Sequence, residues 1–511
     1  MGSRSRSRFR LLALLSACSL VAASCSLLGL EDDTAAGGDT EEEADGEGGS
    51  FTVDDGNDDE TIEDLEVRWA AQRERIVDSL AGGTYGIGAD DILRGPGNLE
   101  VDLTDCPSEW DDTQGLSPSS IKVGMVVAQS GQLASFALLA DGMQAYFDWV
   151  NENGGIDGRD IELVLRDDVY DPGVAQAAVD DLIDNEQPFL VTSVGSSGSL
   201  AIYDDLNDAC IPQPFVVSAH PAWGDPDQHP FTTGLELAYS TEAILWGAWI
   251  RDNLSSQVPV RVVGLVSDND FGEIYADAFG EWAERNPDVV SELTLVRHDP
   301  AQLEVVEEME EVDELDPQVF ISMTTGLPCI SALTEADRLG VLDSALATFN
   351  PSVCKQPSAY MVPVGPAADG VLVVGGGIRS LDDPSLADDT FATFARQRLD
   401  DAGLESQQSL VAIGFAHYGW AHVEALRLAA DLPGGLTRSN LVLALRNLDL
   451  QHPMLFDGVR FSTQGARDGF VIEGAEVSRY DAEARGWFQE GLAIDLNGTS
   501  PSCTWDELVC E

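Results

Sequence analysis

From residue 119 onward, the chain alternates short apolar runs with longer stretches in which apolar residues recur every three or four positions. The short runs predict buried strands over 121–128, 161–166, 189–194, 214–217, 260–266, 293–297 and 318–323. The longer stretches predict helices over 133–153, 174–185, 200–208, 238–253, 274–285, 303–311 and 330–339. This alternation predicts parallel sheets covered by helices on both faces. Because the span is too long for one such sheet, we expect two α/β lobes.

Ligands of open parallel sheets bind beyond the carboxyl ends of the strands. Two lobes that face each other would share one cleft at those ends. The sequence therefore predicts a single binding site between the lobes.

A separate amphipathic helix precedes this body. Thr61 and Asp64 suit its N-terminal cap, and Gly82-Gly83 ends it. Its apolar face is formed by Ile62, Leu65, Trp69, Ile76 and Leu80. We expect one helix packed on the main body, followed over 84–118 by an irregular covering segment, so that 61–118 form one N-terminal unit.

The first residues are typical of a secretory signal. Four arginines in the first ten positions precede an apolar run over 11–23 that is too short to span a bilayer. Cys25 follows two alanines and a serine, a pattern that resembles the bacterial lipobox. We prefer 1–24 as the signal and Cys25 as the lipidated residue, because cleavage before Cys18, the alternative, would leave a very short apolar run. An ordinary cleaved signal is the other interpretation.

An acidic segment follows the signal. Residues 31–60 hold fourteen acids and no base, so they cannot bury enough apolar surface to fold. We expect 25–60 to be a lipid anchor and a disordered tether that holds the body away from a membrane. A solvated tail without a role would have the same composition.

Net charge excludes two classes of function. The chain has 90 acidic and 27 basic residues, and its lysines are Lys122 and Lys355 alone. Nucleic-acid binding requires a surplus of cations, and so does docking on anionic lipid through a basic patch. We therefore expect no nucleic-acid partner and membrane contact through the lipid anchor only.

Six cysteines lie beyond the signal region, an even number that favours disulfides in an exported chain. Fifteen pairings are possible. We prefer Cys503–Cys510, which are close in sequence, and Cys329–Cys354, which flank one helix and one strand; Cys106–Cys210 then remain. The cysteines and six histidines show no zinc spacing, so we expect no metal and no cofactor.

The helix exit over 149–159 contains the specific pattern Asn-x-x-Gly-Gly-Ile-x-Gly-Arg. Further motifs lie in the segments 121–124, 130–131, 167–168, 171–172, 195–197, 266–272 and 414–425. In their residues and in their order along the chain, these motifs resemble the leucine/isoleucine/valine-binding protein family. The resemblance covers about residues 119–495.

This resemblance implies the type I periplasmic-binding fold, a Venus flytrap of two doubly wound parallel-sheet lobes joined by three hinge crossovers. The hinges are expected near 232–237, 376–381 and 456–461. One lobe would comprise 119–234 and 380–456, the other 236–377 and 460–495, with 496–511 as a disulfide-closed tail. The implied function is that of an extracytoplasmic solute-binding component of an ABC importer, a monomer with permease subunits as partners.

The resemblance also implies a ligand site for a small polar or carboxylate-bearing metabolite. The Gly195-Ser196-Ser197 turn would hold a carboxylate at a helix N-terminus. The full expected set is Phe136, Gly195, Ser196, Ser197, Ser218, Ala219, His220, Phe271, Thr325, Ser352 and Trp420, with Tyr418 as a further aromatic candidate.

One position departs from the family pattern. The acid that pairs with a ligand ammonium in amino-acid binders falls at Ser352 in this chain. A buried ammonium without a carboxylate is costly, so another acid would have to replace it. Asp268, Asp270 and Glu236 are the candidates.

Two other functions remain as alternatives. The same flytrap could sense a ligand for a separate membrane receptor. A secreted hydrolase that uses carboxylates is the more remote alternative, because the chain lacks a nucleophile elbow, a Walker loop, a dinucleotide fingerprint and a His-Glu-x-x-His motif. We therefore expect a binding protein rather than an enzyme.

Overall fold

The computed structural model describes residues 60–131, 133–498, 503–504 and 509–510. The predicted signal, the lipidated Cys25 or Cys18 and most of the acidic tether lie outside these residues. So do the side chains of Cys503 and Cys510, although their backbones face each other across the strand pair β18 (Cys503–Thr504) and β19 (Val509–Cys510). Across the described ranges, every helix is too short or too polar to cross a membrane.

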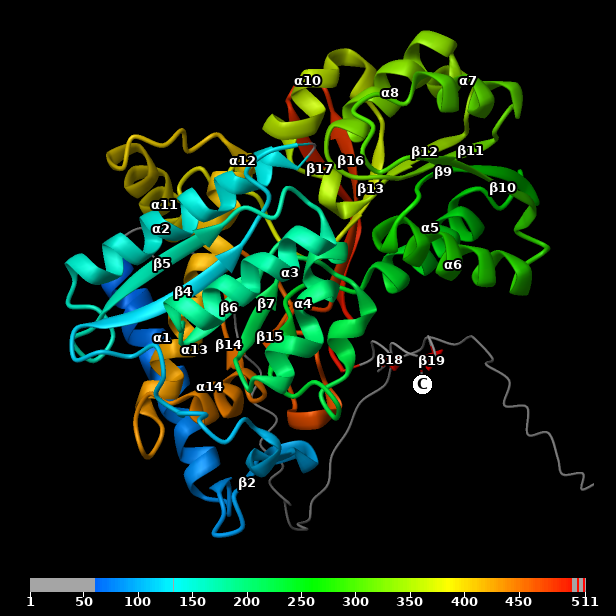
Figure 1. Cartoon of the computed structure of the whole chain (residues 1–511). Helices are drawn as coiled ribbons and strands as arrows, with labels where there is room; N and C mark the ends of the chain where they lie inside the picture. Colours follow the sequence, from blue (N-terminus) through cyan, green and yellow to red (C-terminus); the bar gives the residue numbers. More distant parts are fainter. Residues whose placement is uncertain (1–59, 132, 499–502, 505–508, 511) are drawn as a thin grey trace, which may run out of the picture. The chain divides into compact units, whose positions relative to one another are not determined.

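The first lobe is built on a parallel sheet (Figure 1). Strand β4 (Ser120–Val126) lies between β5 (Asp160–Arg166) and β6 (Leu190–Ser193). The backbone N–H of Val217 donates to Ser193, and that of Gly195 donates to Val217. These bonds continue the sheet to the parallel pair β7 (Gln213–Val216) and β8 (Thr232–Gly234). The four strands predicted for this part of the chain are confirmed as β4, β5, β6 and β7.

Helices cover both faces of this sheet. Residues of α3 (Pro172–Asp181) and α4 (Ser196–Asp208) pack with Val126 and Val191 in one cluster. Ile121, Val123 and Met125 of β4 instead join α2 (Ala137–Glu152) and α13 (Trp420–Asp431) in a second cluster. Successive side chains of a strand point to opposite faces, so a run of apolar residues supplies two cores.

The second lobe contains, among the described residues, a seven-stranded sheet in the order β10-β9-β11-β12-β13-β16-β17. The five parallel strands are β10 (Val290–His298), β9 (Val260–Ser267), β11 (Val319–Met323), β12 (Ala347–Asn350) and β13 (Leu372–Gly375). Strand β16 (Gly474–Asp481) pairs antiparallel with β13 on one side and with β17 (Gly486–Asp495) on the other. The hydrophobic pattern did not predict β12, β13, β16 and β17, and the antiparallel pairing of β16 departs from the all-parallel sheet expected from the sequence.

Helices also cover this sheet on both faces (Figure 1). Val262 of β9 packs in a cluster with residues of α5 (Tyr239–Asn253) and α6 (Asp270–Arg285). The next residue, Val263, packs instead with residues of α7 (Val306–Glu314) and α8 (Leu327–Leu339). The remaining elements are α9 (Val341–Ser344), α10 (Val362–Val364), α11 (Thr390–Asp401), α12 (Ser409–Ile413), α14 (Arg438–Leu445), β14 (Asp449–Leu450) and β15 (Phe461–Ser462).

The predicted N-terminal helix is confirmed as α1 (Ile62–Ala81), with the capping box of Thr61 and Asp64. Its Trp69 packs edge-on against Trp420 and Phe391, with ring centroids 5.5 and 6.0 Å apart. The indole N–H of Trp69 donates to the Gln451 carbonyl at 3.0 Å. These contacts place α1 on the first lobe.

The segment over 84–118 is more ordered than we expected. It forms a small antiparallel sheet of β1 (Gly86–Ile87), β2 (Ile92–Arg94) and β3 (Glu100–Asp102). Its strands are only two or three residues long, which leaves no readable alternation in the sequence.

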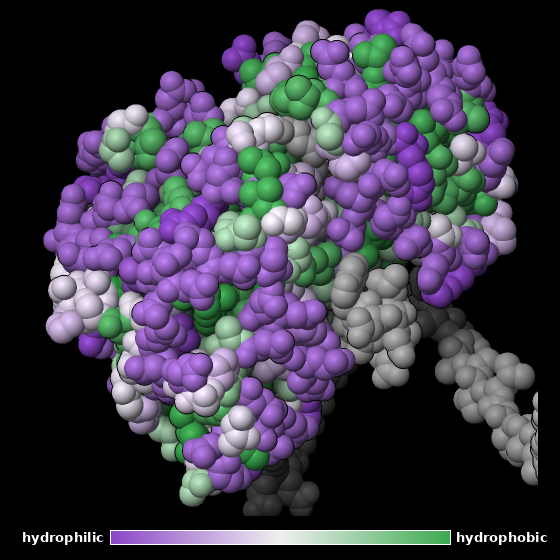
Figure 2. Space-filling view, viewed as in Figure 1, coloured by the Kyte–Doolittle hydropathy of each residue, from purple (hydrophilic) through white to green (hydrophobic). Residues whose placement is uncertain are grey.

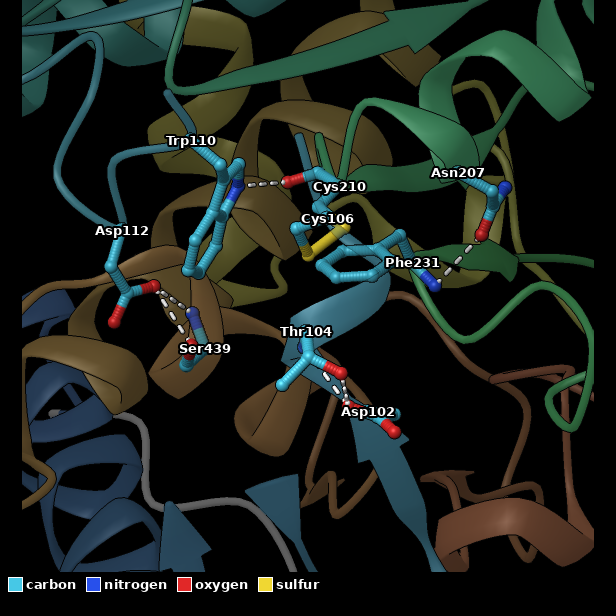
Figure 3. Close-up of a disulfide and its surroundings, with 9 residues drawn as sticks. All are labelled: Asp102, Thr104, Cys106, Trp110, Asp112, Asn207, Cys210, Phe231 and Ser439. Carbon is cyan, nitrogen blue, oxygen red and sulfur yellow. Dashed lines mark hydrogen bonds between the residues drawn. A yellow bond between two sulfur atoms is a disulfide. The ribbon is translucent and has the colours of Figure 1, made fainter. Parts of the chain in front are cut away.

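A disulfide between Cys106 and Cys210, the pairing preferred from the sequence, attaches this segment to the first lobe (Figure 3). Beside it, the Trp110 indole donates to the Cys210 carbonyl at 2.9 Å. Asp112 accepts from both the backbone and the hydroxyl of Ser439. The segment is therefore held at several points along its length.

Polar side chains cover most of the face seen in Figure 2. This distribution agrees with a net charge of -63 at pH 7. Like charges on the surface keep such a protein soluble through mutual repulsion.

Trp69→Ala should destabilise the protein by about 3–5 kcal/mol, because a large buried ring and its hydrogen bond are lost. Val67→Ala on the same helix is the control, since Val67 is 70% exposed against 2% for Trp69. Its effect should stay within about 0.5 kcal/mol. Urea unfolding measures both, and equal effects would show that α1 is not packed as described.

Candidate ligand-binding site

A cavity of about 80 Å³ lies beyond the carboxyl ends of β8, β12 and β13. Glu236 follows β8, Ser352 follows β12, and Gly376 follows β13. Its full lining is Glu236, Leu237, Glu242, Ser352, Lys355, Gln356, Pro357, Val374, Gly375, Gly376, Ile378, Arg379, Ser380, Ser409, Ile413, His417 and Trp487. The cavity therefore lies where an open α/β sheet places its ligand.

Glu242 of α5 brings a buried carboxylate to this cavity. Its two oxygens accept from the backbone N–H and the hydroxyl of Ser352, each at 2.8 Å, and from the Tyr275 hydroxyl at 2.6 Å. Burial raises the pKa of Glu242 to about 8, against the lowering effect of these hydrogen bonds. The carboxyl group thus binds a proton readily unless a cation approaches it.

Glu236 supplies a second carboxyl group. One of its oxygens accepts from the Tyr418 hydroxyl at 3.0 Å. Burial raises the pKa of Glu236, while the Tyr418 hydrogen bond and the positive charge of Lys355 oppose this shift. Two carboxyl groups with raised pKa values therefore line one small cavity.

Lys355 lies in the same wall and forms an ion pair with the fully buried Glu476. The Trp487 indole donates to the Lys355 carbonyl at 2.5 Å. The other oxygen of Glu476 accepts from the backbone N–H of Gly377 at 2.7 Å. These bonds fix the segment after β12 against the segment after β13.

Three buried polar atoms of the lining have no hydrogen-bond partner among the described residues. They are Gln356 Oε1, Arg379 Nε and His417 Nδ1, and the His417 ring also interacts with the backbone of Arg379. Burial lowers the pKa of His417 to about 3, so its ring is neutral at ordinary pH. Since a buried polar atom without a partner costs roughly 1–3 kcal/mol, these atoms point to a polar ligand.

The second preferred disulfide, Cys329–Cys354, is also formed. Cys354 lies between Ser352 and Lys355, and Cys329 lies in the first turn of α8. The bond therefore anchors a lining segment of the cavity to a helix of the second lobe.

Of the expected ligand-binding set, Ser352 alone lines this cavity, and of the candidate acids Glu236 does. Four others gather beside it around Tyr239, a residue that the sequence analysis did not single out. The backbone N–H of Tyr239 donates to the Ala219 carbonyl at 2.8 Å, and its ring packs on Phe271 with centroids 5.1 Å apart. Tyr239 also interacts with Ser218, whose hydroxyl lies 2.9 Å from that of Ser196. Tyr239 thus fills the space between the serine turn and Phe271.

The rest of the expected turn is buried as well. Gly195 has a φ of 90°, and a Cβ there would lie 2.7 Å from the Tyr170 ring. Ser197 Oγ is buried near the Tyr170 hydroxyl without a hydrogen bond of normal geometry. His220 accepts from the Ala222 N–H at 3.2 Å, and burial lowers its pKa to about 3. His220 is therefore neutral, and its side chain caps the turn that begins at Pro221.

The remaining three expected residues lie elsewhere. Phe136 packs in the core of the first lobe. Trp420 is fully buried and packs against Trp69 of α1. Because the neighbouring residues of α13 are also apolar, Trp420 is a core residue. Thr325 is buried between β11 and α8.

Sequence reasoning missed Glu242, Lys355, Gln356, Arg379 and His417. Glu242 carried the only readable signal, because it stands next to Ala243 on the same helix as Trp246 and Ile250, whose side chains are buried. A charged residue on a buried helix face is unusual enough to be a candidate. In the part of the chain that the structure describes, no group of acids, histidines or cysteines could hold a metal ion.

Comparisons with known proteins agree with this architecture. A family model described as "Periplasmic binding protein" matches residues 120–484. A search of curated protein sequences found no match.

Solved structures show the same fold. A fatty acid ABC transporter substrate-binding protein from Thermomonospora curvata has a TM-score of 0.63 and 17% identity, covering 80% of this chain and 96% of its own. A branched chain amino acid ABC transporter protein from Thermus thermophilus with bound valine has a TM-score of 0.64 and 15% identity, covering 74% and 97%. A solute binding protein from Rhodopseudomonas palustris BisB5, in complex with 3,4-dihydroxy benzoic acid, has a TM-score of 0.59 and 16% identity, covering 74% and 98%.

Glu242→Gln should stabilise the protein more at pH 8 than at pH 5. Because the folded pKa of Glu242 is about 8 and the usual value is 4.5, unfolding releases a proton between these pH values. Wild-type stability therefore falls as pH rises through this window, and glutamine removes that loss. The relative gain should be on the order of a few kcal/mol. Urea unfolding at several pH values measures this gain, and Glu284→Gln, at an exposed position of α6, is the control. If the difference in unfolding free energy between Glu242→Gln and wild type did not vary with pH, the burial of the charge would be contradicted.

Proposed function

The chain belongs to the periplasmic binding protein family, and from that premise we propose that it is the extracytoplasmic solute-binding component of an ABC importer. The solved structures with the same fold include substrate-binding proteins of ABC transporters. Their identity to this chain is below 20%, so the ligand has to be argued from the site itself. The partners would be permease subunits, with Cys25, or alternatively Cys18, as the lipid anchor.

The observation that carries this proposal is the cavity at the strand ends, whose largely apolar wall contains several buried polar groups. It holds two carboxyl groups, Glu236 and Glu242, together with the unpartnered Gln356 Oε1 and His417 Nδ1. Carboxylate and amide oxygens accept hydrogen bonds, so a ligand that brings N–H donors satisfies them best. We assign the cavity to a small amine-bearing metabolite, within the amino-acid-like class expected from the sequence.

Glu242 replaces the acid that the family pattern would place at residue 352. Its carboxylate reaches residue 352 from α5, because it accepts hydrogen bonds from the backbone and the hydroxyl of Ser352. Of the acids considered from the sequence, Glu236 also lines the cavity, and Asp268 and Asp270 do not. The amine of the ligand would lie between Glu236 and Glu242.

The other end of the ligand would meet Arg379. Its Nε is a buried donor without a partner, and a guanidinium binds carboxylates well. A ligand with both an amine and a carboxylate or carbonyl group would satisfy the acceptors and this donor together.

Capture would proceed by hinge closure. Residues 236–237, 376 and 378–380 line the cavity and belong to or adjoin two of the expected crossovers. A ligand held there would contact residues whose backbone must move when the lobes close. Contacts that form only in the closed state shift the population toward it.

Glu236→Gln should weaken binding of the amine ligand by roughly 1–3 kcal/mol without unfolding the protein, because one charged acceptor is lost. A thermal-shift screen of amino acids, amides, amines and organic acids would first identify a ligand, since binding to the folded state raises the melting temperature. Calorimetry then compares the variant with the exposed Glu284→Gln.

Ser197→Ala tests the competing location. If the serine turn holds the ligand, Ser197→Ala should weaken binding and Glu236→Gln should not. If no small metabolite shifts the melting temperature of the wild-type protein, the proposed function is wrong.

Affinity for an amine ligand should fall about tenfold per pH unit below pH 8. The pKa of Glu242 is about 8 in the free protein, so an ammonium ion must displace a proton from it at lower pH. Calorimetry in two buffers of different ionisation enthalpy should detect proton release at pH 6.5, and Glu242→Gln should lower the number of protons released. An affinity that does not change between pH 6 and pH 8 would exclude this role for Glu242.

A further inference from the structure

A cavity of about 550 Å³ lies between α1 and the β14–β15 strand pair (Figure 1). It shares no lining residue with the cavity at the strand ends. Its volume is within the range of about 300–1,000 Å³ that is typical of sites for small organic ligands. Because arginines from three separate segments line it, we refer to it as the arginine cavity.

The charge of the arginine cavity is opposite to that of the chain. Its lining holds three arginines and one acid, namely Arg75, Arg460, Arg467 and Asp449. Over the whole chain, 90 acids stand against 27 bases. Arg460 donates to Asp495 at 2.7 Å, and the lining keeps an excess of positive charge even when Asp495 is counted with it. The cavity is therefore a local exception on a surface that otherwise repels anions.

Two of the three guanidinium groups have no carboxylate partner among the described residues. Arg75 donates only to the Ala71 carbonyl of its own helix, at 3.5 Å, and the side chain of Arg467 donates to no described group. Partners are easily found in so acidic a chain, as the ion pairs of Arg94 and Arg297 show. The donors of Arg75 and Arg467 are therefore available to a bound anion.

The walls that carry these arginines are fixed by close contacts. Gly465 has a φ of 62°, and a Cβ there would collide with the Pro96 carbonyl oxygen, so the turn that carries Arg467 packs directly on the turn at Pro96. On α1, the buried Gln72 accepts from the backbone N–H of Gln451 at 2.9 Å. An anion would thus bind between backbones that are already ordered, which lowers the entropic cost of binding.

The arginine cavity depends on the N-terminal unit of this chain. Arg75 and the turn at Pro96 precede residues 120–484, which match the family model, whereas Arg460 and Arg467 lie within them. The cavity forms only where these two parts meet. It is therefore a feature of this chain's N-terminal unit rather than of the fold shared with the solved structures.

We propose that the arginine cavity binds a small anion with two or more negative charges, separately from the ligand at the strand ends. Guanidinium groups bind carboxylates and phosphates through parallel N–H donors. Since Arg75 and Arg467 come from different segments, an anion that presents several charged groups satisfies both. A simple ion such as chloride would leave most of the volume empty. This site does not depend on which metabolite the other cavity captures.

The test uses citrate and pyrophosphate as multivalent probes and acetate as the monovalent one. Isothermal calorimetry on the full chain measures their binding at constant ionic strength set with sodium chloride, because salt alone relieves repulsion within so acidic a protein. Citrate and pyrophosphate should bind at one saturable site. Acetate should bind at least about tenfold more weakly, because it cannot reach two guanidinium groups at once.

Arg467→Gln should lower the affinity for citrate about three- to tenfold, because the positive charge is lost while N–H donors remain. The double variant Arg75→Gln/Arg467→Gln should abolish the binding. Arg285→Gln is the matched control, because the Arg285 side chain is 76% exposed on α6 and lines neither cavity. All of these positions are exposed, so the variants should fold, and circular dichroism verifies it.

Each result bears on the site directly. Loss of citrate binding in the double variant, with wild-type binding in Arg285→Gln, supports the proposal. Equal citrate affinity in the double variant and the wild type would overturn it, because the anion would then bind elsewhere. The absence of saturable binding by both multivalent probes would overturn it as well, and so would acetate binding as tight as that of citrate.

Discussion

The hydrogen bonds between Glu242 and Ser352 tie the first part of α5 to the carboxyl end of β12. They hold a carboxyl group that is almost fully buried, and the Tyr275 hydroxyl donates a further hydrogen bond to it. Leaving such a group unpartnered would cost far more than its hydrogen bonds return, so the surrounding elements must keep their positions. The cavity exists because this arrangement fixes α5, the turn after β12 and, through the Cys329–Cys354 bond, α8 in relation to one another.

Periodicity alone predicted most of the body. The parallel strands up to β11 and the helices between them follow long apolar runs, and α1 follows its capping box and apolar stripe. The missed strands β12 and β13 have four residues each, too few for a pattern. The antiparallel ending of the sheet was missed because β16 and β17 are joined by a short turn, which requires no helix between them.

The binding site was less predictable than the fold. Family resemblance selected the serine turn and Phe271, yet Tyr239 lies between them. A single tyrosine at a helix start carries no sign of that in the sequence. Ser352 lines the cavity as expected from its place in the family pattern, because that place follows from the order of strands along the chain. Lys355, Arg379 and His417 come from three separate segments, and only the tertiary structure brings them to one wall.

The charge of the chain bears on the chemistry of the proposed ligand. With 90 acids against 27 bases, the surface creates a negative potential that attracts cations and repels anions. A simple carboxylate would approach against this field and then meet Glu236 and Glu242 at the end of its path. An amine would be drawn in along it, and its charge would restore the ionised state of groups whose pKa values burial has raised. The long-range field and the local hydrogen-bond acceptors thus favour the same kind of ligand, although the first comes from the whole surface and the second from a few buried side chains.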